Sequence, residues 1–224
     1  MALDVMTMDS VALGDAELAE LADLCAEAGY GHEVGTLSKL RDNPDWVLVT
    51  RVREGTKLRG FSVSSLVRLG GTPSIVFALA VVKRSSMRDA ILKSIMTENF
   101  RRALMAFPDE DVLVGARFNE PGATEAFKTV TEIVPRPGHK ASGEERAWGR
   151  RLAKRYDVAS SAYDEQSFTV TGDGSLPMVI DHESSKPASI DKQVAGQFKH
   201  LDTGRGDYLI MCGWAMAEDL LKYG

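Results

Sequence analysis

The stretch Ser74–Ala90 reads SIVFALAVVKRSSMRDA, and it decides the fold class expected for this chain. Residues 74–82 are almost continuously apolar, which is typical of a strand covered on both faces. A basic pair, Lys83-Arg84, comes next, and one of the two serines after it is placed to cap a helix. Apolar residues then recur at helical spacing as far as Met105. The pattern predicts a central strand that leads directly into the longest helix of the protein.

Upstream of this stretch, the patterns predict a strand, two helices and two further strands. Alternating residues at 3–8 indicate a short strand, and helical spacing runs from Asp15 to a stop at Gly29. A second helix is expected over 33–40, before a proline that disfavours its continuation. Two strand-like segments, 46–52 and 58–69, flank a glycine-containing turn, which favours a hairpin.

Downstream of the long helix, the elements become shorter. Residues 111–118 predict a core strand, and Pro121-Gly122 leads into a helix expected over 123–130. A Ser-x-x-Glu capping box at 142–145 predicts a helix over 143–155. The remaining patterns indicate strands at 168–171, 178–180 and 208–212, a helix at 190–198 and a short terminal helix.

Composition narrows the classes of function. The chain has 224 residues and a formal net charge of −5, whereas proteins that hold nucleic acid mainly through phosphates are basic, so we expect no nucleic-acid partner. No apolar run approaches the ~20 residues of a membrane span, and the N-terminus has no basic signal region. Cys25 and Cys212 lack metal-ligand spacing and are interpreted as reduced core thiols. These features predict a cytoplasmic protein with no metal site and no membrane partner.

The order of the expected elements over residues 1–135 resembles that of the GCN5-related N-acetyltransferase (GNAT) superfamily. Three antiparallel strands feed a crossover helix, and a further strand follows. The resemblance implies an α/β (α+β) fold with a central mixed, mostly antiparallel sheet flanked by helices. Residues 136–224 would then be a C-terminal elaboration that completes the sheet beside the fifth strand, within the same compact domain.

Residues 80–90 occupy the place of the family's valine-rich strand end and glycine-rich loop, which cradles the pyrophosphate of acetyl-CoA. Helix amides and the helix dipole bind the anion there. This chain keeps the helix start and the basic residues, but it has no glycine between Gly71 and Gly115. The resemblance implies acetyl-CoA or another acyl-CoA as cofactor, with these binding residues: Val81, Val82, Ser85, Ser86, Met87, Arg88, Asp89, Ala90 and Asn119.

The segment Asn119–Ala123, NEPGA, looks like the family's sequence after the fifth strand, and it shows where the resemblance stops. Phe127 stands where many members have a tyrosine that protonates the leaving thiolate, and phenylalanine has no proton to give. The strand 74–82 also lacks the glutamate that members often carry there. A catalytic carboxylate would have to come from elsewhere, such as Glu33, Glu120 or Asp181.

Two polar segments have a structural and a functional interpretation. His32 and Glu33 begin the second helix, which borders the acceptor cleft in the resembling fold, but a capping or surface role is the alternative. Asp181-His182-Glu183-Ser184 brings together an acid, a base and a hydroxyl. Neighbours on a strand point to opposite faces, so this run is interpreted as a polar strand end and not as a hydrolase triad.

Two functions follow from these observations. The first is an acyl-CoA-dependent N-acyltransferase that transfers its acyl group directly to an amine acceptor, either a small molecule or a protein. The alternative is a catalytically inactive GNAT-fold protein that binds a macromolecule or forms part of an assembly. The joint loss of the loop glycines, the strand glutamate and the tyrosine motivates this alternative. The sequence specifies neither the acceptor nor the oligomeric state.

Overall fold

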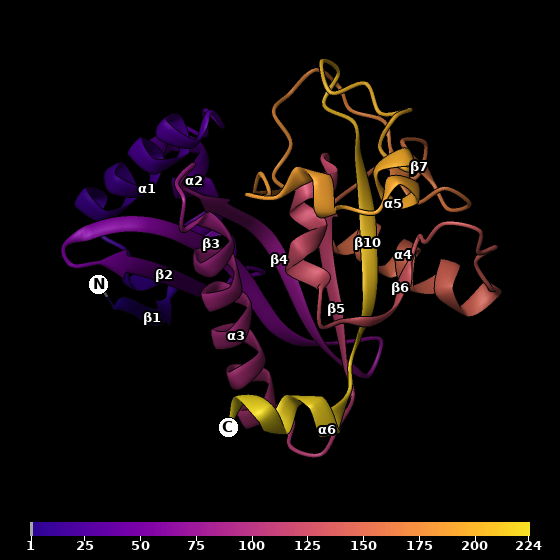
Figure 1. The fold of residues 1–224 in the computed structure, drawn as a ribbon, viewed down its shortest axis with the longest axis horizontal. Coiled ribbons are helices and arrows are strands. Elements are labelled where there is room, and N and C mark those ends of the chain that lie inside the picture. Colours follow the sequence, from indigo (N-terminus) through magenta and orange to yellow (C-terminus); the bar gives the residue numbers. More distant parts are fainter. Residues whose placement is uncertain (1) are drawn as a thin grey trace.

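The computed structural model describes residues 2–224, which form one ten-stranded sheet with helices on both faces (Figure 1). The elements up to the fifth strand follow the predicted order. They are β1 (Leu3–Asp9), α1 (Asp15–Ala28), α2 (Val34–Asp42), β2 (Leu48–Glu54), β3 (Lys57–Leu69), β4 (Thr72–Val82), α3 (Arg88–Ala106) and β5 (Val112–Phe118). A short 3₁₀ turn, Ser10–Ala12, follows β1.

The second part of the chain differs from the prediction in its short elements. The segment expected to be a helix over 123–130 is the 3₁₀ helix η2 (Pro121–Phe127), and the helix expected over 190–198 is reduced to α5 (Lys192–Gly196). β6 and β7 were not predicted, because two to four partly exposed residues carry little periodic signal. The elements are β6 (Thr131–Val134), α4 (Gly143–Arg155), β7 (Tyr163–Asp164), β8 (Thr169–Val170), β9 (Ile180–Asp181), β10 (Tyr208–Ala215) and α6 (Ala217–Leu220), with 3₁₀ turns at Pro187–Ser189 and Leu221–Tyr223.

The sheet has the order β1-β2-β3-β4-β5-β10-β8-β7, with β6 against β10 and β9 against β4. Its pairs are antiparallel except for β4 with β5 and β4 with β9. The predicted mixed, mostly antiparallel sheet is confirmed, and β10 lies beside β5 as expected. One expectation is wrong: the strand near residue 180 does not extend the sheet beyond β5 but pairs with β4.

β4 separates two hydrophobic cores. Ile75, Phe77 and Ala80 belong to the core under α3, and Val76 and Leu79 belong to the core under α1, α2 and α4. The alternation changes phase at Ala78 because the pairing with β3 shifts register by one residue between Val63 and Ser64. The apolar run in β4 therefore fills both faces of the sheet, as the sequence predicts.

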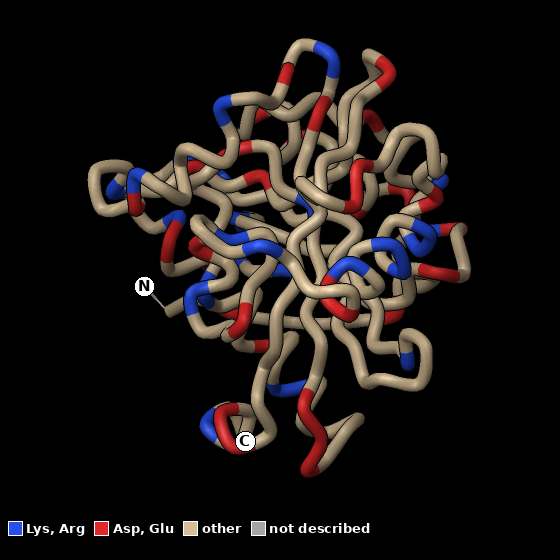
Figure 2. Tube along the Cα trace, turned by 90° about the vertical axis from the view of Figure 1, so that its right-hand side faces the viewer, with Lys and Arg blue, Asp and Glu red and all other residues tan. Residues whose placement is uncertain are grey.

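The outer surface carries both signs of charge. Figure 2 shows acidic and basic residues interspersed along the chain on the side of the molecule that bears α4. Within residues 2–224, no helix combines the length and the apolar character that a bilayer span requires.

Candidate functional site

β4 and β5 are paired only near their beginnings. Ser74, Ile75 and Val76 align with residues 113–115 of β5 as parallel neighbours. Past Val76 the pairing stops, although β4 continues to Val82 and β5 to Phe118. The second half of β4 therefore has one backbone edge that β5 does not use, and that edge leads towards the start of α3.

A segment from the C-terminal part of the chain occupies this edge. We call Val179–Ser185 the strap. The Ala80 amide donates to the Val179 carbonyl at 3.2 Å, and Ala80 and Val81 align with Ile180 and Asp181 as a short parallel pair. Val179, Ile180, Asp181 and His182 are all 1% exposed or less. The strap is thus buried against the part of β4 where the resemblance would place the cofactor.

Polar contacts tie the strap to the beginning of α3. Arg84 Nη2 lies 2.5 Å from Asp181 Oδ1, and Arg88 donates to the carbonyls of Glu183 and Ser184 at 2.7 and 3.2 Å. Asp89 accepts hydrogen bonds from the backbone amide (3.0 Å) and hydroxyl of Ser185. Side chains that would face a diphosphate hold the protein's own chain in this conformation.

His182 completes these contacts. Its Nε2 lies 3.1 Å from Asp89 Oδ1, and its Nδ1 is buried without a partner among residues 2–224. Burial lowers the pKa of His182, against the opposing influence of Asp89. Burial would raise the pKa of Asp89, but hydrogen bonds from Ser185 and the nearby His182 outweigh it and lower that pKa. An ionised Asp89 therefore accepts hydrogen bonds from the strap, in addition to the contacts of the strap with β4, Arg84 and Arg88.

The helix start differs in detail from the expected serine cap. The chain turns at Ser85, whose hydroxyl accepts from the Met87 amide at 3.3 Å and whose carbonyl accepts from the Arg88 amide. Because of this turn, α3 begins at Arg88, and Met87 occupies the cap position without a side-chain hydrogen bond. Ser86 and Ala90 are exposed, while Val82 packs into the core under α3. The first helical turn still presents amides that lack intrahelical partners.

Of the three candidate carboxylates, Asp181 lies in the strap and is paired with Arg84, and the other two have different surroundings. Glu33 is exposed at the N-cap of α2, and its side chain makes no hydrogen bond or ion pair within residues 2–224. Glu120 follows β5, and its Oε1 is buried without a partner in the same range. Burial raises the pKa of Glu120 to about 7; Arg84 opposes this rise, and the Asp181 and Glu183 carboxylates add to it. Glu120 is therefore the candidate that lies beside the strap.

Two other residues from the sequence predictions border the strap. Asn119 donates to the hydroxyl of Tyr30, which connects the end of β5 to the loop between α1 and α2. His32 is 4% exposed, packs near Tyr30 and lies close to the backbone of Pro177, two residues before the strap. Burial and the nearby Arg117 lower the pKa of His32, so this imidazole is held neutral. A surface capping role for His32 is wrong.

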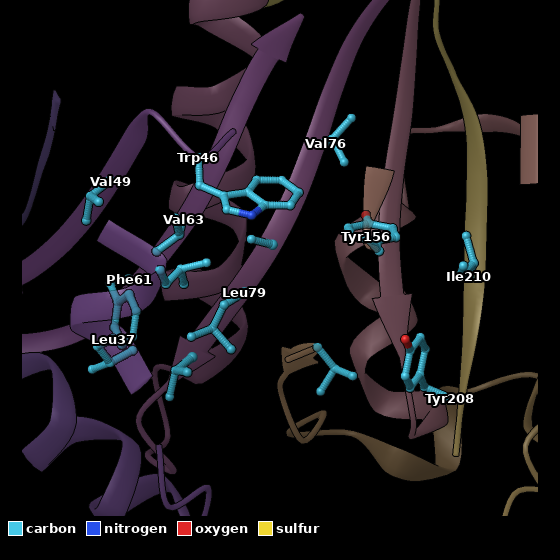
Figure 3. Close-up of a cluster of buried hydrophobic side chains, with 14 of the residues drawn as sticks. Leu37, Trp46, Val49, Phe61, Val63, Val76, Leu79, Tyr156, Tyr208 and Ile210 are labelled. Carbon is cyan, nitrogen blue, oxygen red and sulfur yellow. The ribbon is translucent and has the colours of Figure 1, made fainter. Parts of the chain in front are cut away.

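An arginine and two aromatic residues, which the sequence analysis did not single out, lie where β4 and β5 stop pairing. Arg117 Nη2 donates to the Ala78 carbonyl at 2.7 Å, and the Tyr156 hydroxyl donates to the Phe77 carbonyl at 3.0 Å. The Arg117 guanidinium lies 4.4 Å from the Tyr156 ring centre, and Tyr156 stacks on Trp46 (Figure 3). One feature of the sequence could have drawn attention to Arg117: it is the only charged residue in β5.

Two cavities adjoin these groups. One of about 500 Å³ lies beside α3, next to Asp89, Ala90 and Ser184, and its wall includes Lys93, Lys128 and Lys186. The other, of about 350 Å³, is bordered by Arg117, Tyr156 and Trp46. The first cavity therefore touches both the strap and two residues of the expected cofactor loop.

Comparisons with known proteins returned structures only: no family model and no curated protein matches the sequence. The ribosomal-protein-S18-alanine N-acetyltransferase from Escherichia coli is 10% identical, with a TM-score of 0.47 over 96% of this chain and 95% of that one. The ribosomal-protein-alanine N-acetyltransferase from Brucella melitensis biovar Abortus 2308 is 16% identical, with a TM-score of 0.38 over 46% and 73%. The aminoglycoside 6'-N-acetyltransferase from Enterococcus faecium is 15% identical, with a TM-score of 0.40 over 55% and 65%.

Each of these neighbours is named as an N-acetyltransferase. In this chain, the order of elements up to β5, the parallel β4–β5 pair and the crossover through α3 agree with the arrangement that the resemblance in its sequence predicted.

Proposed function

We propose that this chain is an acyl-CoA-dependent N-acyltransferase whose cofactor slot is closed by its own strap in the conformation described. The supporting observation is the edge of β4 that β5 leaves free and that leads to the N-terminus of α3. A free strand edge pairs with an extended chain of amide groups, and a helix N-terminus attracts an anion. Acyl-CoA offers both features, since a pantetheine arm with two amides precedes its diphosphate.

The strap indicates what this edge accepts. Its backbone pairs with Ala80 and Val81, and its Asp181 carboxylate meets Arg84. When the strap leaves, the backbone of residues 80–82 becomes free to pair with pantetheine. The side chains of Arg84 and Arg88 become free to receive the diphosphate, next to the first amides of α3. The cavity beside α3, with Lys93, Lys128 and Lys186 in its wall, has room for the nucleotide.

The reaction requires a neutral amine next to the thioester. The amine nitrogen attacks the carbonyl carbon, the carbon–sulfur bond breaks, CoA leaves as a thiolate, and the amine loses a proton to a base. Glu120 is the proposed acceptor of that proton, because a carboxyl with a pKa of about 7 is largely ionised just above neutral pH. Phe127 provides no proton for the thiolate, which would be protonated from solvent.

The alternative, a GNAT-fold protein without catalysis, is favoured by one observation. The Asp89 carboxylate lies at the start of α3, where a diphosphate would approach, and it binds the strap. In this alternative the strap is a permanent part of the core, and the chain serves as a binding or assembly component.

Calorimetric titration of acetyl-CoA separates the two functions. We expect weak heat with the native chain and clear saturation with a variant whose strap is loosened, Asp181→Ala/Ser185→Ala. Saturation should be accompanied by acetyl transfer to at least one member of an amine panel. The absence of heat with both proteins at high micromolar cofactor would reject the enzyme and leave the alternative.

A further inference from the structure

The second cavity, which we call the Arg117 cleft, has a volume of about 350 Å³ and lies on the α2 and α4 side of β4. Its wall is formed by the end of α2, the segment just before β2, the strand β5 and the end of α4. The basic and aromatic residues of its wall are Lys39, Trp46, Arg117, Lys154, Arg155 and Tyr156.

The Arg117 cleft carries an excess of positive charge. Arg155 is paired with Asp45, so these two charges balance each other. Lys39, Arg117 and Lys154 form no ion pair within residues 2–224, and the remaining carboxylate in the wall is that of the exposed Asp157. The wall therefore offers more cationic groups than its own carboxylates neutralise.

Arg117 is held in a fixed orientation. Its guanidinium lies between the rings of Tyr156 and Tyr208, at 4.4 and 5.7 Å from their centres. Nη2 is used by the Ala78 carbonyl, and Nε is enclosed without a partner among residues 2–224. Nη1 makes no hydrogen bond in the same range, so Arg117 retains donors that are not satisfied by the protein. A partly buried guanidinium without a carboxylate is costly unless an anion joins it.

Further along the same stack, Arg155 covers the ring of Trp46 at 5.0 Å, and Trp46 lies 5.9 Å from Tyr156 at an angle of 14°. The resulting series runs Arg155, Trp46, Tyr156, Arg117. Stacking on aromatic faces holds both guanidinium planes in place. Arg117 is therefore a rigid part of the cleft wall and not a flexible surface charge.

The cleft also adjoins the expected position of the acyl group. In the proposed function, pantetheine runs back along β4 from the diphosphate at residues 85–90, which brings the acyl end near Leu79 and Ala78. Arg117 and Tyr156, which both line the cleft, hydrogen-bond to the carbonyls of Ala78 and Phe77. An acceptor seated in the cleft would thus have its amine beside the thioester.

We propose that the Arg117 cleft binds the anionic group of the acceptor, so that the acceptor is an amine that also carries a carboxylate or a phosphate. Its role as acceptor site rests on the proposed function, whereas anion binding does not. Arg117 would receive the anion, with Lys39 and Lys154 adding attraction from the rim.

The test is a calorimetric titration without cofactor, using three amines of similar size: β-alanine, phosphoethanolamine and propylamine. We expect β-alanine or phosphoethanolamine to bind and propylamine not to bind. Whichever of the two anionic amines binds more tightly indicates whether the acceptor carries a carboxylate or a phosphate. Arg117→Gln should weaken binding by at least tenfold, since a charge-assisted hydrogen bond is lost. The exposed control Lys140→Ala should have no effect.

If Arg117→Gln does not fold, Lys39→Ala/Lys154→Ala replaces it, since both side chains are exposed, and should weaken binding severalfold. Equal binding of propylamine and the anionic amines, or unchanged binding by the folded variants, overturns the inference. Anion binding without any acetyl-CoA binding to the strap-loosened protein would reject the proposed function and leave the anion site standing. Acetyl-CoA binding without anion binding would reject the anion site alone.

Discussion

Replacing Asp181 and Ser185 by alanine removes the side-chain contact of the strap to Arg84 and one of its two side-chain contacts to Asp89, the other being that of His182. Both substitutions lie in the strap, so every residue expected to hold the cofactor is retained. Hydrogen bonds to charged groups contribute about 1.5–3 kcal/mol each. Arg84 and Asp89 are about one-third exposed, which reduces the two contributions to roughly 2–4 kcal/mol together.

A loss of that size raises the population of the open state by roughly 30- to 1000-fold, since each 1.4 kcal/mol is a factor of ten. The apparent affinity for acetyl-CoA should rise by up to the same factor, because a ligand that needs a minor state binds in proportion to the population of that state. The assay is calorimetry with acetyl-CoA, combined with hydrogen exchange of residues 79–82 and 179–185. A matched control is Asp164→Ala/Ser167→Ala, which removes an exposed Asp–Ser pair at the far edge of the sheet.

If the amides of the strap exchange faster in Asp181→Ala/Ser185→Ala while acetyl-CoA binding stays unchanged, the strap does not control access to the slot. If neither quantity changes, the two side chains do not hold the strap closed. A cooperative thermal transition in the variant confirms that the comparison is made on a folded protein.

Three further changes test the surroundings of the strap and the cleft. Gly122→Ala would bring a Cβ within 2.7 Å of the Ser184 amide nitrogen, so the strap should be displaced. The free energy of unfolding should fall by about 1–3 kcal/mol, and the amides of the strap should exchange faster. Unchanged hydrogen exchange would contradict this. Burial raises the pKa of Glu120 to about 7, so its ionisation should destabilise the folded state progressively as the pH rises from about 4.5 to 7. Glu120→Gln should remove up to roughly 3 kcal/mol of this pH dependence of the free energy of unfolding, measured by urea unfolding at pH 5 and pH 8. An equal effect of the substitution at both pH values would contradict this expectation. Tyr156→Phe leaves the Phe77 carbonyl without its donor and should lower the free energy of unfolding by about 1–2 kcal/mol; a loss no larger than that of Tyr223→Phe would argue against it.

Much of the fold follows from local patterns. The apolar run of β4, the helical period of α3 and the alternation in β1 involve neighbours in sequence, so each could be predicted without knowledge of the tertiary structure. The capping box that begins α4 at Ser142 was equally local and is confirmed. The order of these elements sufficed to predict a mixed, mostly antiparallel sheet, because few topologies place a crossover helix between two strands.

The candidate site depended on contacts between distant residues. The sequence predicts a strand near residue 180, but a two-residue strand has no pattern that selects a partner, and the free edge of β4 decided its place. The pKa of Glu120 likewise depends on burial and on Asp181 and Glu183, some 60 residues further along the chain. The sequence therefore predicted the elements up to β5, their order and the departures from the loop of the family that it resembles. The position of the strap against β4 and of Arg117 against Tyr156 came from the tertiary structure alone, because desolvation and unpaired backbone edges arise from packing and not from neighbours in the chain.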